Sequence, residues 1–216
     1  MAVNPLGVVI LISGRGSNME AIIDAASKKS IDVDVRAVIS NNPDAVGLET
    51  AHKAGITTRA VDHRQFNDRD TFDAALIESI DSYQPGLIVL AGFMRLLGNA
   101  FVSHYVDRLM NIHPALLPAF PGLNTHERAL QAGVKRHGAT VHFVTDDVDA
   151  GPIIMKAAVD IKTGDSVSDL ASRVLEQEHR IYPMAIGWFA DGRLSIKDGN
   201  VLLDGARQPD QGLKSA

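Results

Sequence analysis

The chain has 216 residues, of which 45% are hydrophobic and 22% charged, with a net charge of −5 and a pI of about 5.9. This acidic balance argues against nucleic acid as the main ligand, because nucleic-acid-binding domains usually carry a basic face. Cysteine is absent, which excludes disulfides, thiolate metal sites and a cysteine nucleophile. The apolar run at residues 7–12 is too short for a membrane span and has no basic leader before it, so we expect a cytoplasmic protein without a membrane partner.

Short apolar, β-branched runs alternate with amphipathic stretches through the first half of the chain, which predicts an α/β fold. We expect a parallel sheet with helices on both faces and ligands at the carboxyl ends of its strands. The last two strands share one short connection and should be antiparallel. Without a linker or repeat, residues 1–216 should form one domain, with a loose polar tail from about 204 to 216. The expected strands are 8–12, 33–39, 57–61, 87–91, 108–112, 137–145 and 153–161. Helices are expected over 43–55, 66–83, 124–132 and 168–190, the last with a break or bend at Pro183. One further helix should begin near Ser17, and a short one should end near residue 106.

The loop Ser-Gly-Arg-Gly-Ser-Asn at 13–18 joins the first strand to the first helix. A glycine turn at a helix N-terminus can hold an anion, because free N–H groups and the helix dipole converge there. The alternative is a tight turn with no ligand. Ser17 and Glu20 have the spacing of a capping box. The candidate phosphate-binding residues are Gly14, Arg15, Gly16, Ser17 and Asn18.

This loop lacks the marks of a dinucleotide or nucleoside-triphosphate site. Met19 stands where a dinucleotide fingerprint has its third glycine, and the second strand ends in Ser40-Asn41-Asn42 rather than an acidic residue. The Gly-Lys-Ser/Thr ending of a P-loop is also missing. A terminal monophosphate therefore fits better than NAD or ATP.

Asn111 and His113 lie two residues apart at the end of an apolar strand, so both side chains point to the same face. The strand at 137–145 is followed by three carboxylates, of which Asp149 stands just before Gly151-Pro152 in a loop of specific shape. If the strand ends meet, an amide donor, a titratable ring and a carboxylate share one site. That set suits transfer of a carbonyl group. The alternative for Asp149 is an ordinary solvated turn.

Three further positions carry polar groups where chemistry or support is possible. Glu178 falls on an apolar helix stripe, where a carboxylate is either partnered or functional unless it reaches solvent at the rim. Thr140 and His142 are candidates for supporting residues, and His142 alternates with Val141 and Phe143, so it either faces the site or supports it. His126, His137 and His142 raise the question of zinc, but no pair has the spacing of a helix-borne zinc motif, so no metal is expected.

Several separated motifs, in order along the chain, resemble the phosphoribosylglycinamide formyltransferase family, the folate-dependent enzymes of purine biosynthesis. They lie at residues 12–18, 90–95, 111–118 and 142–146. The resemblance implies a Rossmann-like formyltransferase fold with a seven-stranded, mostly parallel sheet. It implies formyl transfer from 10-formyltetrahydrofolate to the amine of glycinamide ribonucleotide, both small molecules. We expect a monomer or homodimer without a metal.

The resemblance also assigns residues. Catalysis is implied for Asn111, His113 and Asp149, with Asn111 and protonated His113 donating to the oxyanion and Asp149 moving the proton. The phosphate is implied to bind at Gly14 to Asn18 and the ribose at Glu178. The implied folate contacts are Met94, Arg95, Leu96, Leu97, Val102, Asn111, Asp146, Val148 and Asp149.

Four other readings compete. A 10-formyltetrahydrofolate deformylase would share the core but needs no phosphate loop, and that family carries an N-terminal regulatory domain. A methionyl-tRNA formyltransferase would carry a further C-terminal domain, and the acidic balance suits tRNA poorly. A nicotinamide-dependent dehydrogenase is disfavoured by Met19. A non-catalytic nucleotide-binding module would leave the Asn111–His113 pair without a purpose.

Overall fold

The computed structural model describes residues 4–206 and 212–213. The chain divides into two compact units, Met1–Met110 and Asn111–Ala216, here called the first and second unit. Among the described residues, no helix combines the length and apolar character needed to cross a membrane.

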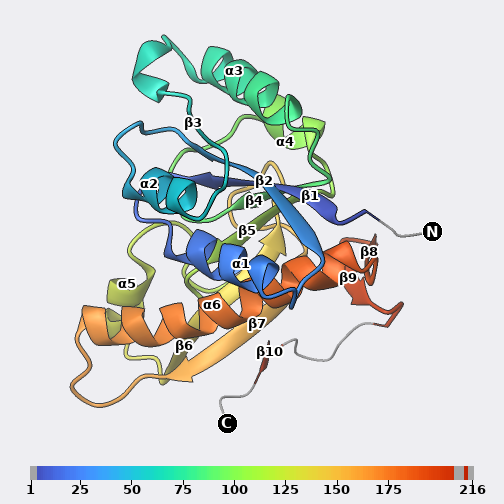
Figure 1. The fold of residues 1–216 in the computed structure, drawn as a ribbon. Coiled ribbons are helices and arrows are strands. Elements are labelled where there is room, and N and C mark those ends of the chain that lie inside the picture. Colours follow the sequence, from blue (N-terminus) through green and yellow to red (C-terminus); the bar gives the residue numbers. More distant parts are fainter. Residues whose placement is uncertain (1–3, 207–211, 214–216) are drawn as a thin grey trace. The chain divides into compact units, whose positions relative to one another are not determined.

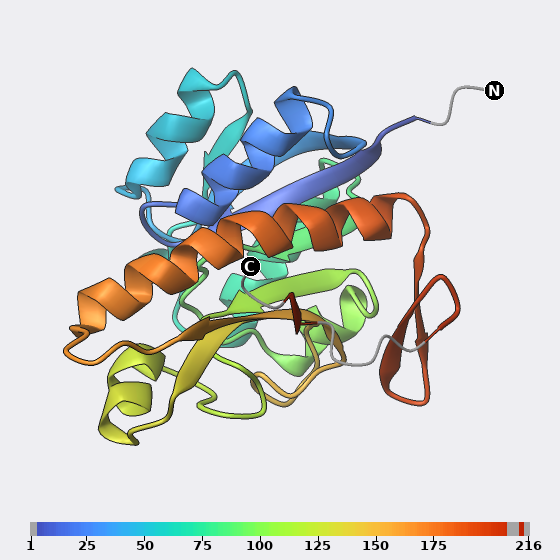
Figure 2. The ribbon, with the colours of Figure 1, turned by 90° about the horizontal axis from the view of Figure 1, so that it is seen from below.

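The first unit contains parallel strands in the order β4-β1-β2-β3. Residues 8–12 of β1 are completely buried, as expected of a strand covered on both faces. Figures 1 and 2 agree in showing α1 and α2 on one side of these strands and α3 and α4 on the other. The strands are β1 (Leu6–Ile12), β2 (Val33–Ser40), β3 (Thr58–Ala60) and β4 (Leu87–Leu90), and the helices are α1 (Ser17–Ser27), α2 (Val46–Lys53), the 3-10 turn His63–Gln65, α3 (Arg69–Asp81) and α4 (Asn99–His104).

The strand that carries the candidate amide and imidazole, β5 (Leu109–His113), crosses from the first unit into the second. The second unit continues with β6 and β7, which pair antiparallel as predicted. Helix α6 packs against both strands and contacts α5 (Figures 1 and 2). These elements are α5 (Thr125–Gln131), β6 (Arg136–Phe143), β7 (Ile153–Asp160), α6 (Val167–Ala190), β8 (Leu194–Lys197), β9 (Asn200–Leu203) and β10 (Gly212–Leu213).

The structure corrects several local expectations. No capping box forms at Ser17, because Gly16 occupies the N-cap position of α1 in a left-handed conformation without a side-chain cap. Asn124, at the N-cap of α5, is also left-handed without a side-chain cap. Helix α3 begins three residues later than predicted, since the Asp68 carboxylate accepts a hydrogen bond from the Thr71 amide (2.8 Å). Helix α6 runs unbroken through Pro183.

The chain after α6 forms a hairpin that the sequence analysis did not predict. Its turn is Asp198-Gly199, and both residues have positive φ values (49° and 71°), the conformation that favours Asp-Gly in two-residue hairpins. At the start of the predicted loose tail, the Asp204 carboxylate pairs with Arg193 (2.6 Å) and residues 204–206 turn back on β9. Residues 207–211 and 214–216 of that tail lie outside the described residues.

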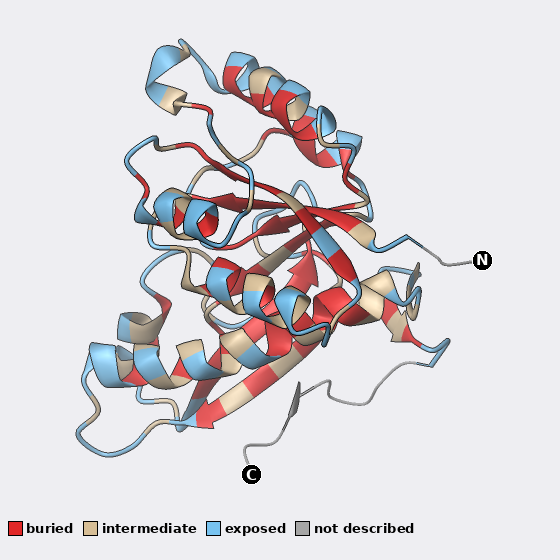
Figure 3. Ribbon diagram, in the orientation of Figure 1, coloured by how far each residue is buried: buried red, intermediate tan, exposed pale blue. Residues whose placement is uncertain are grey.

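Strand β6 is almost completely buried (Figure 3), and it carries a histidine into the core. His137 is 1% exposed, with its ring edge-on to those of His126 (centroids 5.2 Å apart) and Phe120 (5.9 Å). Burial, together with the neighbouring His126, lowers the pKa of His137 to about 4. Burial also lowers the pKa of His126. Both rings therefore fold in the neutral state at pH 7.

Gly138 permits the close approach of β6 and β7. A Cβ atom at Gly138 would lie 1.9 Å from the Ala157 carbonyl oxygen and 2.9 Å from Leu116. We expect Gly138→Ala to lower the free energy of unfolding by roughly 1–3 kcal/mol or more, because backbone must move to make room. Gly14→Ala is the control, since nothing lies within 4 Å of its added Cβ. Urea denaturation measures both, and equal stabilities would contradict the packing argument.

Neutral burial of His137 predicts a pH dependence of stability. Between the folded pKa of about 4 and the ordinary histidine pKa of 6.5, the unfolded chain binds the proton and the folded chain does not, so stability falls as the pH drops through this range. We expect His137→Phe to flatten the loss between pH 7 and pH 4.5, with His126 and His142 accounting for the remainder. Urea midpoints across this range test the expectation. The exposed His52→Gln should leave the slope unchanged, and a His137→Phe slope equal to that of the original chain would refute the assignment.

Candidate functional site

In the first unit, one hydroxyl joins the carboxyl ends of three strands. The Ser13 side chain, after β1, donates to the Asn41 carboxamide after β2 (2.6 Å) and accepts from the Met94 amide after β4 (2.7 Å). Both hydrogen-bonding roles of the hydroxyl are thus used. Alpha/beta proteins bind ligands at the carboxyl ends of their parallel strands. Here Ser13, the first residue of the candidate phosphate loop, connects these ends.

The candidate phosphate loop leads directly into α1. Gly16 takes a left-handed conformation (φ 78°) at the helix N-cap, and the Gly14 carbonyl accepts from the Gly47 amide (3.0 Å). A Cβ at Gly47 would lie 2.9 Å from the Arg15 carbonyl, so the contact with α2 requires glycine. Arg15 is exposed, Ser17 half-buried and Asn18 buried. The first-turn amides of α1 begin here, where an anion gains from the helix dipole.

The candidate folate residues of the first unit follow β4. Met94 and Leu96 are unusually exposed for apolar side chains (69% and 64%), and Leu97 is half-buried. The Arg95 guanidinium lies over the Phe72 ring, 5.4 Å from its centroid. Val102, in contrast, is buried in α4. Exposed apolar side chains beside one another are typical of a ligand-binding surface.

In the second unit, the amide of Asn111 is oriented by a buried histidine. The His142 Nδ1–H donates to the Phe143 carbonyl (2.9 Å), which leaves Nε2 to accept from the Asn111 carboxamide nitrogen (3.1 Å). Burial lowers the pKa of His142 against the opposing effects of the Phe143 carbonyl and Asp149. A neutral ring with this tautomer directs the Asn111 NH₂ group, whose second N–H stays available to a ligand.

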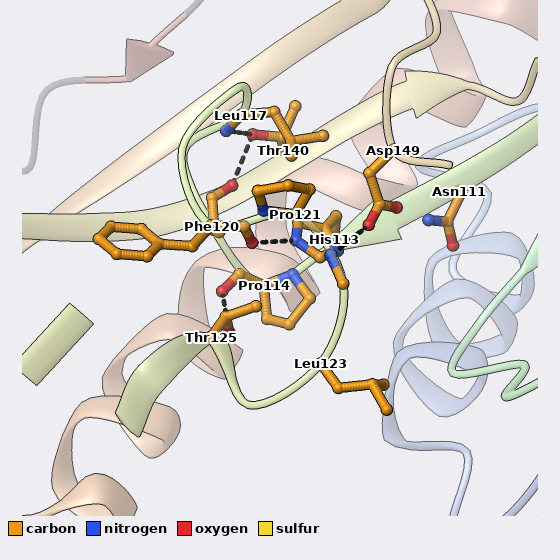
Figure 4. Close-up of polar contacts among 12 residues, drawn as sticks. Asn111, His113, Pro114, Leu117, Phe120, Pro121, Leu123, Thr125, Thr140 and Asp149 are labelled. Carbon is orange, nitrogen blue, oxygen red and sulfur yellow. Dashed lines mark hydrogen bonds and ion pairs between the residues drawn. The ribbon is translucent and has the colours of Figure 1, made fainter. Parts of the chain in front are cut away.

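His113 lies between a backbone carbonyl and a carboxylate (Figure 4). Its Nε2–H donates to the Phe120 carbonyl (2.9 Å), and its Nδ1 faces the Asp149 carboxylate at 3.4 Å. The His113 ring is only 5% exposed. The separation from Asp149 is longer than a tight charge-assisted hydrogen bond, so Nδ1 is the ring nitrogen that is left for a substrate.

Asp149 reaches this site from the loop between β6 and β7. Its carboxylate accepts from the Gly122 amide (2.8 Å) and lies 3.8 Å from His142 Nε2. Its backbone is left-handed (φ 54°), a conformation that aspartate adopts more readily than most residues. The three residues whose strand ends were expected to meet are therefore brought together.

Thr140 supports the loop that follows β5. Its hydroxyl donates to the Ala115 carbonyl (2.6 Å) and accepts from the Leu117 amide (3.0 Å), and it is completely buried. The Lys156 ammonium donates to the Leu117 carbonyl from β7. Thr140 thus fixes the path of the backbone leaving His113.

The remaining candidates of the second unit differ in exposure. Glu178 is 7% exposed in the middle of α6, which excludes the reading of a solvated rim residue. Asp146 and Val148 are exposed in the loop before Asp149, with Val148 58% exposed. Within the part of the chain that the structure describes, no group of three or more histidine, cysteine, aspartate or glutamate side chains could hold a metal ion.

Two backbone groups of this site were not predicted from the sequence. The Phe120 carbonyl and the Gly122 amide both come from the loop after β5. The available signal was the Pro121-Gly122 pair, which marks a turn soon after a strand carrying functional side chains. Ser13 was also not among the predicted site residues, although it is the first residue of the glycine loop.

Comparison with known proteins gives a consistent result. The family model described as formyl transferase matches residues 6–186. The phosphoribosylglycinamide formyltransferase of Escherichia coli is 54% identical over 207 residues, which cover 96% of this chain and 98% of that protein. The structure of the Coxiella burnetii phosphoribosylglycinamide formyltransferase is 51% identical, with a TM-score of 0.91 and coverage of 97% and 99%.

A formyltetrahydrofolate deformylase from Pseudomonas syringae is more distant, at 25% identity and a TM-score of 0.85, and the match covers 92% of this chain but 66% of that one. The likeness to the Coxiella burnetii structure confirms the predicted fold class, an α/β Rossmann-like formyltransferase fold with a mostly parallel seven-stranded sheet. The chain belongs to the formyl transferase family.

Proposed function

We propose that this chain transfers the formyl group of 10-formyltetrahydrofolate to the amine of glycinamide ribonucleotide, a step of purine biosynthesis. The observation that carries the proposal is the set formed by Asn111, His113 and Asp149, because it supplies an amide donor, an imidazole and a carboxylate within one small site. Support also comes from the near full-length likeness to the E. coli and C. burnetii enzymes.

Asn111 and His113 are proposed to stabilise the tetrahedral intermediate. When the substrate amine attacks the formyl carbon, the carbonyl electrons move to oxygen. The second N–H of the Asn111 carboxamide, directed by His142, and the proton on His113 Nδ1 can then donate to that oxyanion. Loss of one such donor typically costs about 100- to 1,000-fold in rate.

Asp149 is proposed to serve twice. Its carboxylate lies 3.4 Å from His113 Nδ1 and orients the imidazole ring. As the intermediate collapses, the bond from the formyl carbon to N10 breaks, and N10 must gain the proton that the attacking amine loses. Asp149, directly or through a water, can carry that proton. Thr140 contributes by holding the backbone after His113.

Substrate contacts are proposed in both units. The loop from Gly14 to Asn18 suits the ribonucleotide phosphate, because it is open at Gly14 and leads into a helix N-terminus. Glu178 is proposed to bind ribose hydroxyls. The folate is proposed to contact the apolar surface after β4 and the loop before Asp149, with these residues: Met94, Arg95, Leu96, Leu97, Val102, Asn111, Asp146, Val148 and Asp149.

Residues 1–216 are proposed to work as one formyltransferase domain, since one family model matches residues 6–186. The acidic composition supports a protein that acts on small molecules rather than on nucleic acid, and its location is proposed to be the cytoplasm. The enzyme is proposed to be a monomer or homodimer that uses 10-formyltetrahydrofolate as co-substrate without a metal.

The proposed reaction predicts that release of tetrahydrofolate depends on the acceptor. Mixed with 10-formyltetrahydrofolate, the protein should release tetrahydrofolate only when glycinamide ribonucleotide is added, because the amine is the nucleophile. Absorbance or chromatography of the folate follows the product. Equal release without the ribonucleotide would instead indicate the alternative function, a deformylase that uses water.

The role of Asp149 predicts a selective loss of turnover in Asp149→Asn. This variant keeps an oxygen for the Gly122 amide but removes the charge beside His113. We expect kcat to fall by about 100-fold or more, in the range of general acid–base effects. Asp160→Asn, an exposed carboxylate of the second unit at the end of β7, is the matched control and should stay near the original rate. Similar rates for Asp149→Asn and the control would disprove the assignment.

A further inference from the structure

The loop after β5 supplies one backbone group to each partner of the His113–Asp149 pair. The Phe120 carbonyl accepts from His113 Nε2 (2.9 Å), and two residues later the Gly122 amide donates to Asp149 (2.8 Å). The distance between the imidazole and the carboxylate therefore depends on the conformation of residues 120–122, which we call the clamp segment. Any shift of the clamp segment moves both catalytic groups.

The backbone of the clamp segment is unusual. Phe120 and Gly122 both have left-handed conformations, with φ values of 55° and 77°. A left-handed conformation is unfavourable for phenylalanine and persists where surrounding contacts enforce it. The clamp segment lies at the surface, with Pro121 exposed and its two neighbours half-buried. It therefore needs support from outside itself.

That support comes from one side chain of α5. The Arg128 Nη1 donates to the Pro121 carbonyl (2.5 Å) and lies 3.3 Å from the Leu123 carbonyl. Its guanidinium also lies over the Phe120 ring, 5.7 Å from the ring centroid. Arg128 thus engages the carbonyls on both sides of Gly122 and the side chain of Phe120.

Helix α5 itself is fixed to the backbone next to His113. The Thr125 hydroxyl, in the first turn of α5, donates to the Pro114 carbonyl (2.7 Å; Figure 4). Arg128 lies one turn further along and is half-buried. The position of the Arg128 guanidinium is therefore fixed relative to Pro114, the residue that follows His113. Arg128 can in turn fix the position of the clamp segment.

We propose that Arg128 is a positioning residue of the formyltransferase, which sets the His113–Asp149 geometry by holding the clamp segment. Its two carbonyl contacts pull the oxygens of Pro121 and Leu123 towards α5, and this orients the intervening Gly122 amide towards Asp149. Its contact with the Phe120 ring fixes the residue whose carbonyl orients His113. A planar guanidinium can do both at once, whereas a lysine ammonium is a point charge without a flat face.

The first test measures exchange of the Gly122 amide in Arg128→Met. Because the supporting contacts are lost, we expect this amide to exchange about 10-fold faster by NMR. The Phe143 amide, bonded to the Pro152 carbonyl in the same unit, should keep its protection. Arg136→Met is the matched control, since Arg136 is an exposed arginine of the second unit whose nearest carboxylate is also exposed. Unchanged Gly122 protection would refute the proposal, as would equal loss at Phe143, which would indicate general destabilisation.

The second test is kinetic and rests on the proposed formyl transfer. We expect Arg128→Met to lower kcat by about 10-fold with smaller changes in KM, because misplaced catalytic groups slow the chemical step. Arg128→Lys should recover part of the rate by donating to one carbonyl, and Arg136→Met should retain full activity. Faster Gly122 exchange with an unchanged kcat would overturn the catalytic role of the clamp. If the protein had no formyltransferase activity at all, the exchange test would still decide whether Arg128 holds the clamp segment.

Discussion

The hydrogen bond from the Gly122 amide to the Asp149 carboxylate is the interaction on which the candidate site depends. His113 ends β5, and Asp149 lies in a loop that follows a different strand, so neither element alone brings the two side chains together. The peptide groups of residues 120–122 contact both side chains. The distance between acid and base is thus set by backbone geometry, which is more rigid than a contact between two mobile side chains.

The first unit uses the same principle with a different group. The Ser13 hydroxyl donates to Asn41 and accepts from the Met94 amide. It thereby connects the segments that follow β1, β2 and β4. The loop that contains the exposed apolar residues Met94 and Leu96 is therefore anchored where the Met94 amide binds Ser13. In both units, a loop with functional side chains is anchored by a residue that has no chemical role in the proposed reaction.

The sequence was sufficient for the parts that follow from periodicity. Buried β-branched runs located the strands, and the spacing of Asn111 and His113 correctly predicted side chains on one face at a strand end. Turn geometry was less accessible, because the hairpin at Asp198-Gly199 and the left-handed N-caps depend on φ values that composition indicates only weakly. The contacts of Phe120 and Gly122 were invisible for a further reason, since they involve backbone atoms that every residue possesses.

His142 shows a related limit. Its alternation with Val141 and Phe143 placed it either in the site or behind it, and only the tertiary structure distinguishes these. The ring donates to the carbonyl of its own neighbour and accepts from Asn111. This arrangement requires the neutral state, which burial favours by lowering the pKa of the ring. A histidine thereby acts as an amide-orienting group rather than as a proton carrier.

The left-handed backbone of Asp149 has a consequence for how this position can vary over evolution. The proposed chemistry requires a carboxylate, which leaves aspartate and glutamate as options. The positive φ value favours glycine, asparagine and aspartate over other residues. Only aspartate satisfies both requirements, so glutamate should be rejected for its backbone and asparagine for its charge. Two independent requirements, backbone conformation and charge, therefore exclude neutral substitutions at this position.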